Sequence, residues 1–552
     1  MSIILIIETS VMYLILESVI HTGMLKMKNI FRQTAIIIFI TSAISVNFGC
    51  GSDQPPAQAQ PGTLVELIGQ NESELFPIAP ELHQLPSPKL PIGVFDSGIG
   101  GLTVLAEIVR LDNFNNVTHV PGPDGIPDFE DERFIYLGDQ ANMPYGNYSA
   151  ENKTEFLREL IVKDAAFLLG RRYWPSKSAV SPMFDKPPVK SIVIACNTAT
   201  AFGINHLRDT LTQWNIPVYI IGVVNAGAEG AIENIRKSGA VRNEQAEIMS
   251  AGAVAVMATV GTCSSDGYVR ALEQSASDAG IDIAAVIQQG CFGLAGAIEG
   301  DSSYITAEDG SSGSYQGPSQ DNPNAPIDMS LLARYSFESS GIIGDANGGD
   351  AIRLNSVENY IRYHTTTLVE NYREAGNTRP IGTVILGCTH FPFQAEAIGA
   401  AFERLRTFED QDGSRPYGGL IAEQIGFIDP AQFTAVQLYE NLRDSELLLE
   451  EPETAVIDTD EFYISLPHSG TETSNLTESG GFTYDFKYGR VPGSVDVEYV
   501  KRVPMSLQTL SPAAIGSISD TMPWIIERLA KFNAESPRCK GIPATERIAV
   551  TR

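Results

Sequence analysis

The sequence predicts an α/β fold with two pseudo-symmetric domains, mostly parallel sheets, helices on both faces and an active site in the interdomain cleft. Apolar runs rich in β-branched residues alternate with helical patterns along most of the chain. Short, nearly continuous apolar runs are typical of parallel strands buried on both faces. Two of the runs end in a cysteine, which indicates that a structural unit is duplicated. The expected strands are residues 92–95, 134–137, 191–195, 218–224, 254–260, 283–287 and 383–386.

A helical pattern is clearest just before the last of these strands. Gly376 and Pro380 follow the pattern and predict where the helix ends. In the C-terminal region we expect strands at residues 461–466 and 481–487 and a helix at 522–531, but no motif there indicates a role. One face of the clearest helix carries Leu354, Val357, Ile361 and Leu368.

The composition limits the class of partner. The 552 residues allow about two to four domains of ordinary size. A net charge of -29 repels phosphate backbones, so we expect a small-molecule or protein partner and no nucleic acid. The six cysteines form neither a C-x-x-C pair nor a zinc-like spacing, and they are too few for a disulfide scaffold.

The N-terminus has the pattern of an export signal over residues 1–50, with Met27 as the expected true start. A short basic region after Met27 precedes an apolar run at residues 34–46, which is too short to span a bilayer in its mature form. Cys50 resembles the lipidated cysteine of a bacterial lipoprotein cleavage site. Plain secretory cleavage, a retained anchor and a misassigned start are the alternatives.

The segment that follows the signal bears on the cellular location of the protein. Residues 51–90 are rich in proline without a sustained period, which is typical of a tether. We therefore expect an exported protein, periplasmic or held at the membrane only through a lipid anchor at Cys50. If the signal is not used, the protein is cytoplasmic.

Two stretches interrupt the alternation of strands and helices. Residues 112–132 and 301–350 are rich in Gly, Asp and Asn and predict surface insertions. Acidic residues around Gly125 resemble fragments of calcium loops, but the ordered run of acidic ligands is missing. We therefore expect a solvated acidic loop and no metal site.

Two strands end in nearly the same way, in residues 192–198 (IVIACNT) and 384–390 (VILGCTH). Each places a cysteine, Cys196 or Cys388, just beyond the carboxyl edge of a parallel strand, where open α/β sheets build ligand sites. A following helix N-terminus favours the thiolate form. One such cysteine is more often an inert buried thiol. Two in matching contexts, both followed by polar residues, indicate a reactive pair.

Two facing thiols suit the inversion of a stereocentre, because one thiolate can remove a proton from carbon while the other thiol delivers one to the opposite face. An amino-acid α-proton is far less acidic than a thiol, so the substrate carboxylate and ammonium must be held by preorganised groups. Asn197, Thr198, Thr389 and His390 follow the thiols and suit this task. His390 could also tune Cys388, or it could be a structural hydrogen bonder.

Four segments carry distinctive motifs: residues 91–105 (PIGVFDSGIGGLTVL), 136–146 (containing YLGD and PYG), 195–199 (ACNTA) and 386–392 (LGCTHFP). Together they resemble the successive motifs of cofactor-independent glutamate racemases, and their order and approximate spacing also fit this family. The motifs ACNTA and DSGIGG favour its glutamate branch over the aspartate and hydantoin racemases. Weaker matches lie at residues 261–268, 291–299 and 427–430.

The resemblance implies a role for each matched residue. Cys196 and Cys388 would be the acid/base thiols. Asp96, Glu299 and His390 would help to set the protonation of the thiols. The substrate would be bound by Asp96, Ser97, Tyr145, Gly146, Asn197, Thr198, Thr262, Thr389 and His390.

Other interpretations of these residues remain open. The glycine-rich run after Asp96 and Ser97 could cradle a phosphate, although neither a G-x-G-x-x-G spacing nor a P-loop lysine supports a nucleotide. Tyr145 could be a turn-anchoring aromatic. Glu299 could be merely exposed. The family's usual Cys-Pro is Cys291-Phe292 in this chain.

The resemblance also implies a domain order. Residues 91–224 and 391–552 would form the first domain with its C-terminal extension, and residues 225–390 would form the second. The family implies no metal, pyridoxal phosphate or nucleotide, and it allows a homodimer by analogy.

We therefore expect a racemase that interconverts L- and D-glutamate and is linked to D-amino-acid supply for peptidoglycan. A racemase of aspartate, another amino acid or a hydantoin is one alternative, and a catalytically silent amino-acid-binding lipoprotein is another. Export is in tension with the mechanism, because an oxidising compartment threatens two free thiols. Substrate profiling separates the racemases, and thiol variants that still bind ligand would identify the silent receptor.

Overall fold

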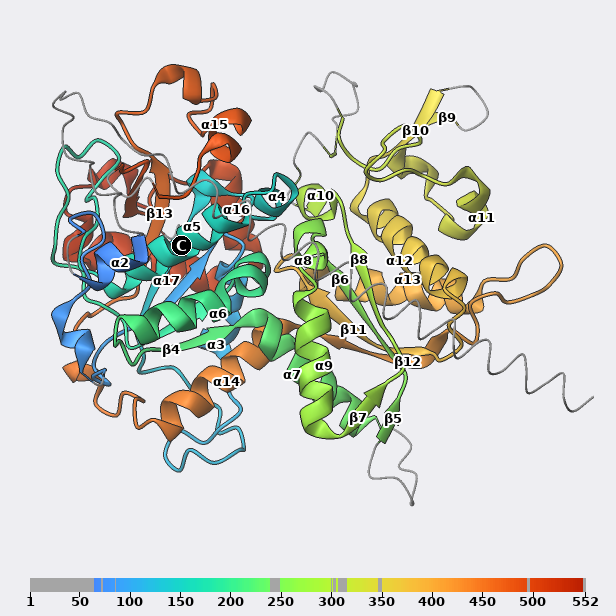
Figure 1. Cartoon of the computed structure of the whole chain (residues 1–552), viewed down its shortest axis with the longest axis horizontal. Coiled ribbons are helices and arrows are strands. Elements are labelled where there is room, and N and C mark those ends of the chain that lie inside the picture. The colour runs from blue at the N-terminus through green and yellow to red at the C-terminus, as the bar shows by residue number, and fades with distance from the viewer. Residues whose placement is uncertain are drawn as a thin grey trace, which may run out of the picture. The chain divides into compact units, whose positions relative to one another are not determined.

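The computed structural model describes residues 64–70, 73–84, 86–238, 249–298, 300, 304–305, 315–345, 350–493 and 497–549 (Figure 1). The expected export signal over residues 1–50, the lipid-anchor candidate Cys50, Glu299, and residues 51–63, 71–72 and 85 of the expected tether lie outside the described residues. In the part of the chain that is described, no helix combines the length and the apolar character needed to cross a membrane.

The larger sheet has the strand order β14-β13-β2-β1-β3-β4. All neighbouring pairs are parallel except β13 and β14, which are antiparallel. The central strands are almost fully buried, as expected for parallel strands covered on both faces. The strands are β1 (Ile92–Asp96), β2 (Phe134–Gly138), β3 (Ser191–Ile194), β4 (Tyr219–Gly222), β13 (Glu461–Pro467) and β14 (Val500–Pro504).

The smaller sheet has the order β12-β11-β6-β8, and every pair in it is parallel. Two further strand pairs lie outside both sheets: β5 with β7, which are parallel, and β9 with β10, which are antiparallel. The strands are β5 (Met249–Ala251), β6 (Ala253–Ala258), β7 (Ile281–Ile283), β8 (Val286–Gly290), β9 (Ile342–Asp345), β10 (Asp350–Leu354), β11 (Ile381–Gly387) and β12 (Ile421–Ile428).

Helices pack in groups around the two sheets. The longer helices are α3 (Leu102–Arg110), α5 (Thr154–Leu169), α6 (Asn197–Gln213), α7 (Val223–Lys237), α9 (Gly267–Ala279), α12 (Val357–Glu374), α13 (Ala395–Thr407), α14 (Pro430–Asp444), α16 (Pro512–Thr521) and α17 (Pro523–Glu535). The shorter ones are α2 (Leu64–Gly69), α4 (Gly146–Ala150), α8 (Val260–Ser264), α10 (Leu294–Ile298), α11 (Leu332–Tyr335) and α15 (Tyr484–Gly489).

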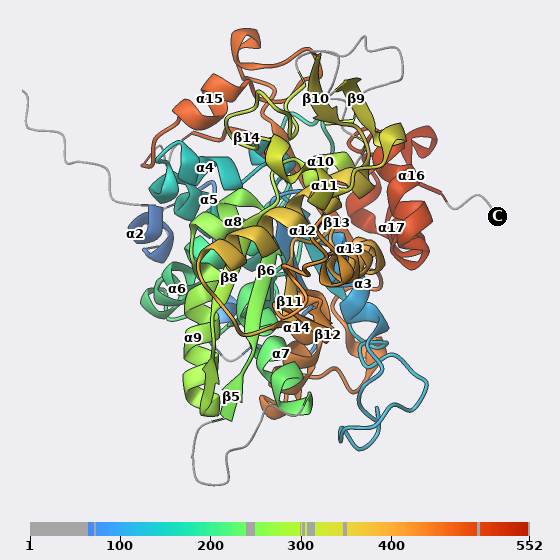
Figure 2. The same cartoon turned by 90° about the vertical axis from the view of Figure 1, so that its right-hand side faces the viewer.

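The helix contacts define which elements cover each sheet. Near the larger sheet, α5 packs on α6, while α3 packs on α14 and α17. Near the smaller sheet, α7 packs on α9 and β11, and α12 packs on α13 and β8. Figure 2 shows the smaller sheet with α12 and α13 in front of it. The predicted fold class, α/β with mostly parallel sheets, is confirmed.

Local chemistry explains the helix starts that position the site. Cys196 is the N-cap of α6, and its sulfur accepts a hydrogen bond from the Ala199 amide. Asp429 caps α14, and Pro430 occupies the first turn, where a missing amide hydrogen costs nothing. Ser356 caps α12, so this helix begins after Leu354, which belongs to β10.

Four expected strands differ from the structure. The expected strand at 254–260 ends at Ala258, and α8 begins at Val260. Residues 283–287 span a break, because β7 pairs with β5 whereas β8 pairs with β6. The expected strand at 218–224 ends at Gly222, where α7 begins. Residues 481–487 form part of α15 instead of a strand, because the Thr483 side chain accepts a hydrogen bond from the Phe486 amide and caps a helix.

One expected domain boundary also differs. The sequence predicts that residues 391–552 belong to the first domain, but β12 pairs with β11 in the smaller sheet and α13 packs on α12. The chain therefore stays with the smaller sheet through Ile428. It returns to the larger sheet with β13, which pairs with β2.

The expected insertion at residues 112–132 forms a loop that is stabilised by its own carboxylates. Asp112 accepts hydrogen bonds from the amides of Asp124 and Gly125. Asp128 accepts from the amides of Asn113 and Phe114. These carboxylates therefore organise the loop backbone, which accounts for the acidic composition that resembled a calcium loop.

Candidate active site

Cys196 lies directly after β3, buried at the start of α6. Its sulfur is 3.4 Å from the Ala199 amide nitrogen and 3.7 Å from the Ser97 hydroxyl oxygen. Burial, together with the charge of nearby Asp96, raises the pKa of the Cys196 thiol to about 12. The amide contact at the helix N-terminus acts in the opposite direction, because it stabilises the thiolate.

Asp96 ends β1, the strand that pairs with β3, so its carboxylate lies at the same sheet edge as Cys196. One carboxylate oxygen accepts hydrogen bonds from the amides of Gly98 and Gly101 at 3.1 and 3.0 Å. Burial raises the pKa of Asp96, and these amide hydrogen bonds partly oppose the shift. A β-carbon at Gly101 would lie 2.5 Å from that of Asp96, so the close turn requires glycine.

Cys388 occupies the equivalent position after β11 of the smaller sheet and is also buried. Its sulfur lies 3.7 Å from Nδ1 of His390, within hydrogen-bonding range for sulfur. Gly387 precedes it, and a β-carbon there would lie 2.8 Å from the ring of Tyr268. A residue with a β-carbon at position 387 would therefore clash with this ring.

Two contacts bring the loops of the two sheets together. The Tyr268 hydroxyl donates to Asn197 Oδ1 at 2.7 Å, and the same ring packs against Gly387. The hydroxyl oxygens of Thr198 and Thr262 are 3.3 Å apart. The neighbours of one cysteine thus contact the segment that flanks the other.

Gly100 provides a further point of close approach. A β-carbon at Gly100 would lie 2.9 Å from the Thr389 hydroxyl oxygen and 3.3 Å from Cε1 of His390. It would also lie 3.7 Å from a carboxylate oxygen of Asp96. The turn after β1 therefore meets the loop after Cys388, and the two thiol-bearing loops belong to one site.

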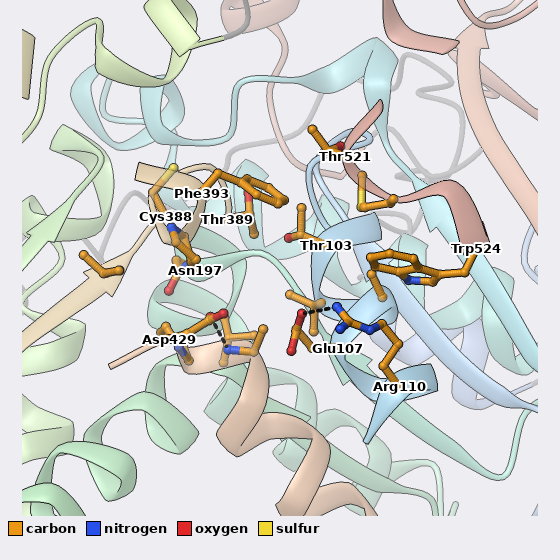
Figure 3. A pocket seen from close by; sticks show the side chains of 18 residues that line it. Thr103, Glu107, Arg110, Asn197, Cys388, Thr389, Phe393, Asp429, Thr521 and Trp524 are labelled. Atoms are coloured by element: carbon orange, nitrogen blue, oxygen red, sulfur yellow. Dashed lines mark hydrogen bonds and ion pairs between the residues drawn. The ribbon is translucent and has the colours of Figure 1, made fainter. Parts of the chain in front are cut away.

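A cavity of about 110 Å³ opens beside Cys388 (Figure 3). Cys388, Thr389 and Asn197 line one side of it, whereas Arg110 and Trp524 lie on the other. The guanidinium of Arg110 lies 4.4 Å from the centre of the Trp524 ring. The C-terminal helices thus contribute to a cavity that reaches one of the two thiols. Cys196 is not among its lining residues.

Tyr145 has a different environment from the one expected for a substrate-binding phenol. Its ring is buried, and its hydroxyl lies 2.7 Å from carboxylate oxygens of both Asp139 and Asp164. Gly146 instead faces the other sheet, because a β-carbon at Gly261 would lie 2.5 Å from the Gly146 Cα. The backbone after Tyr145 approaches the site, while its hydroxyl is held by the two carboxylates.

The structure therefore brings most of the expected site residues together. Glu299 lies outside the described residues. The Tyr145 hydroxyl points toward the carboxylates of Asp139 and Asp164. The sequence reasoning missed Tyr268, although it ends the weakly matching segment 261–268. Among the described residues, no cluster of three or more His, Cys, Asp or Glu could hold a metal ion. The residues brought together are Asp96, Ser97, Cys196, Asn197, Thr198, Thr262, Cys388, Thr389 and His390.

The chain is similar to curated glutamate racemases. It is 36% identical over 187 residues to that of Oceanobacillus iheyensis and 33% identical over 180 residues to that of Levilactobacillus brevis. These alignments cover 34% and 33% of this chain but 48% and 45% of the relatives, so the chain spans about half their length. The glutamate racemase of Geobacter metallireducens is 27% identical over 362 residues, which cover 65% of this chain and 83% of the relative. No protein-family model matches the chain.

Solved glutamate racemases also align with the structure. Isoform RacE1 from Bacillus anthracis has a TM-score of 0.37 and 22% identity, and the match covers 67% of this chain and 86% of that one. The Francisella tularensis enzyme in complex with D-glutamate has a TM-score of 0.35 and 18% identity, with 74% and 99% covered. TM-scores this low do not establish a shared arrangement of the whole chain.

Proposed function

We propose that this protein is a cofactor-independent racemase that interconverts L- and D-glutamate by proton transfer at the α-carbon. The observation that carries the proposal is the pair Cys196 and Cys388. Each follows a parallel strand of a different sheet, and their loops meet through Gly100, Asn197 and Tyr268. The similarity to curated glutamate racemases supports glutamate as the substrate.

The proton transfers balance between the two cysteines. One thiolate takes the α-proton and becomes a thiol, leaving a planar carbanion. The other thiol donates its proton to the opposite face of the carbon and becomes a thiolate. The reverse reaction exchanges the roles. Before the next turnover in the same direction, one proton must pass from the first thiol to the second, either through neighbouring side chains or through solvent.

The surroundings of each thiol suit this exchange of roles. Burial favours the protonated form of Cys196, the acid in one direction. When Cys196 acts as the base, its thiolate is stabilised by the Ala199 amide at the N-terminus of α6. His390 Nδ1 is positioned to exchange a proton with Cys388.

Polar groups at the meeting point of the loops are suited to an amino-acid substrate. The hydroxyls of Thr198, Thr262 and Thr389 can donate to the α-carboxylate, and the Asp96 carboxylate can attract the ammonium. Cys196 and Cys388 are each only 6% exposed, and the cavity reaches Cys388 alone, so access of a substrate to both thiols requires the contacts between the loops to open. Closure then excludes water, which strengthens the electrostatic stabilisation of the carbanion.

Cellular location and role belong to the same proposal. The signal-like pattern of residues 1–50 supports export, with a lipid anchor at Cys50. We infer a role in D-amino-acid supply for peptidoglycan, with a homodimer as the working assembly.

Mass spectrometry of the membrane fraction tests the anchor: acylated Cys50 supports it, and an unmodified soluble protein starting at Met27 or earlier contradicts it.

A substrate panel tests the proposed activity. We expect the purified protein, under reducing conditions, to convert L-glutamate to D-glutamate and the reverse, as measured by circular dichroism or chiral chromatography. Inversion of aspartate or a hydantoin instead of glutamate would keep the reaction and change the substrate. Saturable glutamate binding without inversion of any compound would favour the silent receptor.

A substitution at Gly100 should disturb the meeting of the loops. We expect Gly100→Ala to lower kcat/KM for glutamate about 10-fold or more, because displacing reacting groups by a few tenths of an ångström to 1 Å is costly in catalysis. The added β-carbon would lie 2.9 Å from the Thr389 hydroxyl. Gly516→Ala, in α16 with nothing within 4 Å of the added carbon, is the matched control. Equal kinetics for both variants would contradict the proposed position of Gly100.

A further inference from the structure

The C-terminal region forms hydrogen bonds with five of the eight residues of one loop of the candidate active site. This loop, residues 139–146, carries Tyr145 and Gly146 and is called the Tyr145 loop below. The Ser465 hydroxyl donates to Asp139 at 2.6 Å and accepts from the Ala141 amide at 3.0 Å. The start of the loop is therefore held by β13.

A second set of contacts comes from the residues around α15. Arg490 donates to the side-chain oxygen of Asn142 at 2.6 Å. Lys487 donates to the backbone carbonyl of Met143, and the Tyr488 hydroxyl donates to that of Pro144 at 3.2 Å. Three successive residues, from Asn142 to Pro144, are thus bound by one short helix and the residue that follows it.

The third contact reaches Tyr145 through a buried charge. Arg502 on β14 donates to Asp164 at 3.0 Å, and the side chain of Asp164 is completely buried. Asp164 contacts the Tyr145 hydroxyl, which also contacts Asp139. Arg502 is thus hydrogen-bonded to one of the two carboxyl groups that hold Tyr145. The contact is long-range, because Asp164 and Arg502 are 338 positions apart in the sequence.

The position of the Tyr145 loop matters for the proposed reaction, because Gly146 lies against Gly261 of the opposite segment. A small shift of the loop would change how closely the two thiol-bearing sides approach. Contacts made only for stability need not converge on the polar atoms of a single loop.

We propose that residues 461–493 and 497–504 act as a positioning element for the Tyr145 loop, with Arg502 as a positioning residue that acts through Asp164 and Tyr145. The inference rests on the proposed racemase function and assigns a role to a region for which no motif indicates one. Arg502 does not touch the substrate in this account; it fixes the loop that contributes Gly146 to the site.

Kinetics of four variants test the inference. We expect Arg502→Met to lower kcat/KM for both glutamate enantiomers about 10- to 100-fold, as expected for loss of one charge-assisted hydrogen bond. Arg502→Lys keeps the charge and should recover part of the loss. Tyr488→Phe removes one hydroxyl that binds the loop, and it should raise KM severalfold even if Arg502→Met fails to fold. Glu498→Gln removes an ion pair with Arg172 in the same region but leaves the hydrogen bond from Arg502 to Asp164 in place, and it should leave the kinetics unchanged.

Hydrogen–deuterium exchange separates this inference from the proposed activity. We expect faster exchange in the peptide covering residues 139–146 for Arg502→Met and Tyr488→Phe, but not for Glu498→Gln. If the wild type racemises no amino acid, the proposed function fails while this exchange result still tests the contact. Unchanged exchange in the loop, or equal kinetic losses in Glu498→Gln, would overturn the positioning role.

Discussion

We expect Cys196→Ser and Cys388→Ser each to lower the rate of glutamate racemisation by about 10²- to 10⁴-fold, the usual contribution of one general acid or base. A serine hydroxyl is a far weaker acid than a thiol, so it can neither form the base nor deliver the proton at a useful rate. Both cysteines are buried beside polar partners, Ser97 for Cys196 and His390 for Cys388, so the hydroxyl fits without added volume. Circular dichroism with either enantiomer as the starting substrate measures the loss.

The two variants should also differ from each other. The remaining thiolate can still remove the α-proton from the enantiomer that presents it, so each variant should exchange the α-proton of one enantiomer only. The two variants should be selective for opposite enantiomers. Cys539→Ala is the control, because this buried cysteine lies in the C-terminal region away from the site. Racemisation at the wild-type rate in either serine variant would contradict the assignment.

We expect Lys190→Met to lower the free energy of unfolding by about 3–5 kcal/mol, the usual cost of breaking a buried ion pair from one side. The Lys190 side chain is 0% exposed and lies 2.7 Å from a carboxylate oxygen of Glu132. Its ammonium also donates to the carbonyls of Pro88 and Leu447. Without Lys190, Glu132 stays buried next to two unpaired carbonyls.

Urea denaturation of the two variants measures the difference. Lys237→Met is the matched control, because it removes an exposed pair with Glu233. Such surface pairs contribute about 0–1 kcal/mol. Equal losses of unfolding free energy in Lys190→Met and Lys237→Met would contradict the importance of the buried pair.

The strands that carry the thiols could be predicted from the sequence because their signals are local. Residues 191–195 and 383–386 are apolar, β-branched runs that end in a small residue and a cysteine, and both form central parallel strands. By contrast, β12 was missed because several of its residues are exposed and its apolar pattern is interrupted. The break between β7 and β8 was missed because it depends on which strands they pair with.

The same contrast between local and long-range signals applies to the residues of the candidate site. The positions of Cys196 and Cys388 after their strands follow from neighbouring residues. The partners of Tyr145 do not, because Asp164 lies on another helix and Arg502 in a distant part of the chain. Tyr268 contacts Asn197 only because the two sheets meet, and no spacing within either motif encodes that contact.

The position of deuterium after partial conversion in deuterated buffer is the most direct test of the two-thiol account. Starting from L-glutamate, the account predicts D-glutamate that carries deuterium at the α-carbon, while the remaining L-glutamate keeps its original proton. The same pattern should hold with D-glutamate as the starting substrate. Deuterium that enters the remaining substrate as fast as the product forms would indicate a single base and contradict the account.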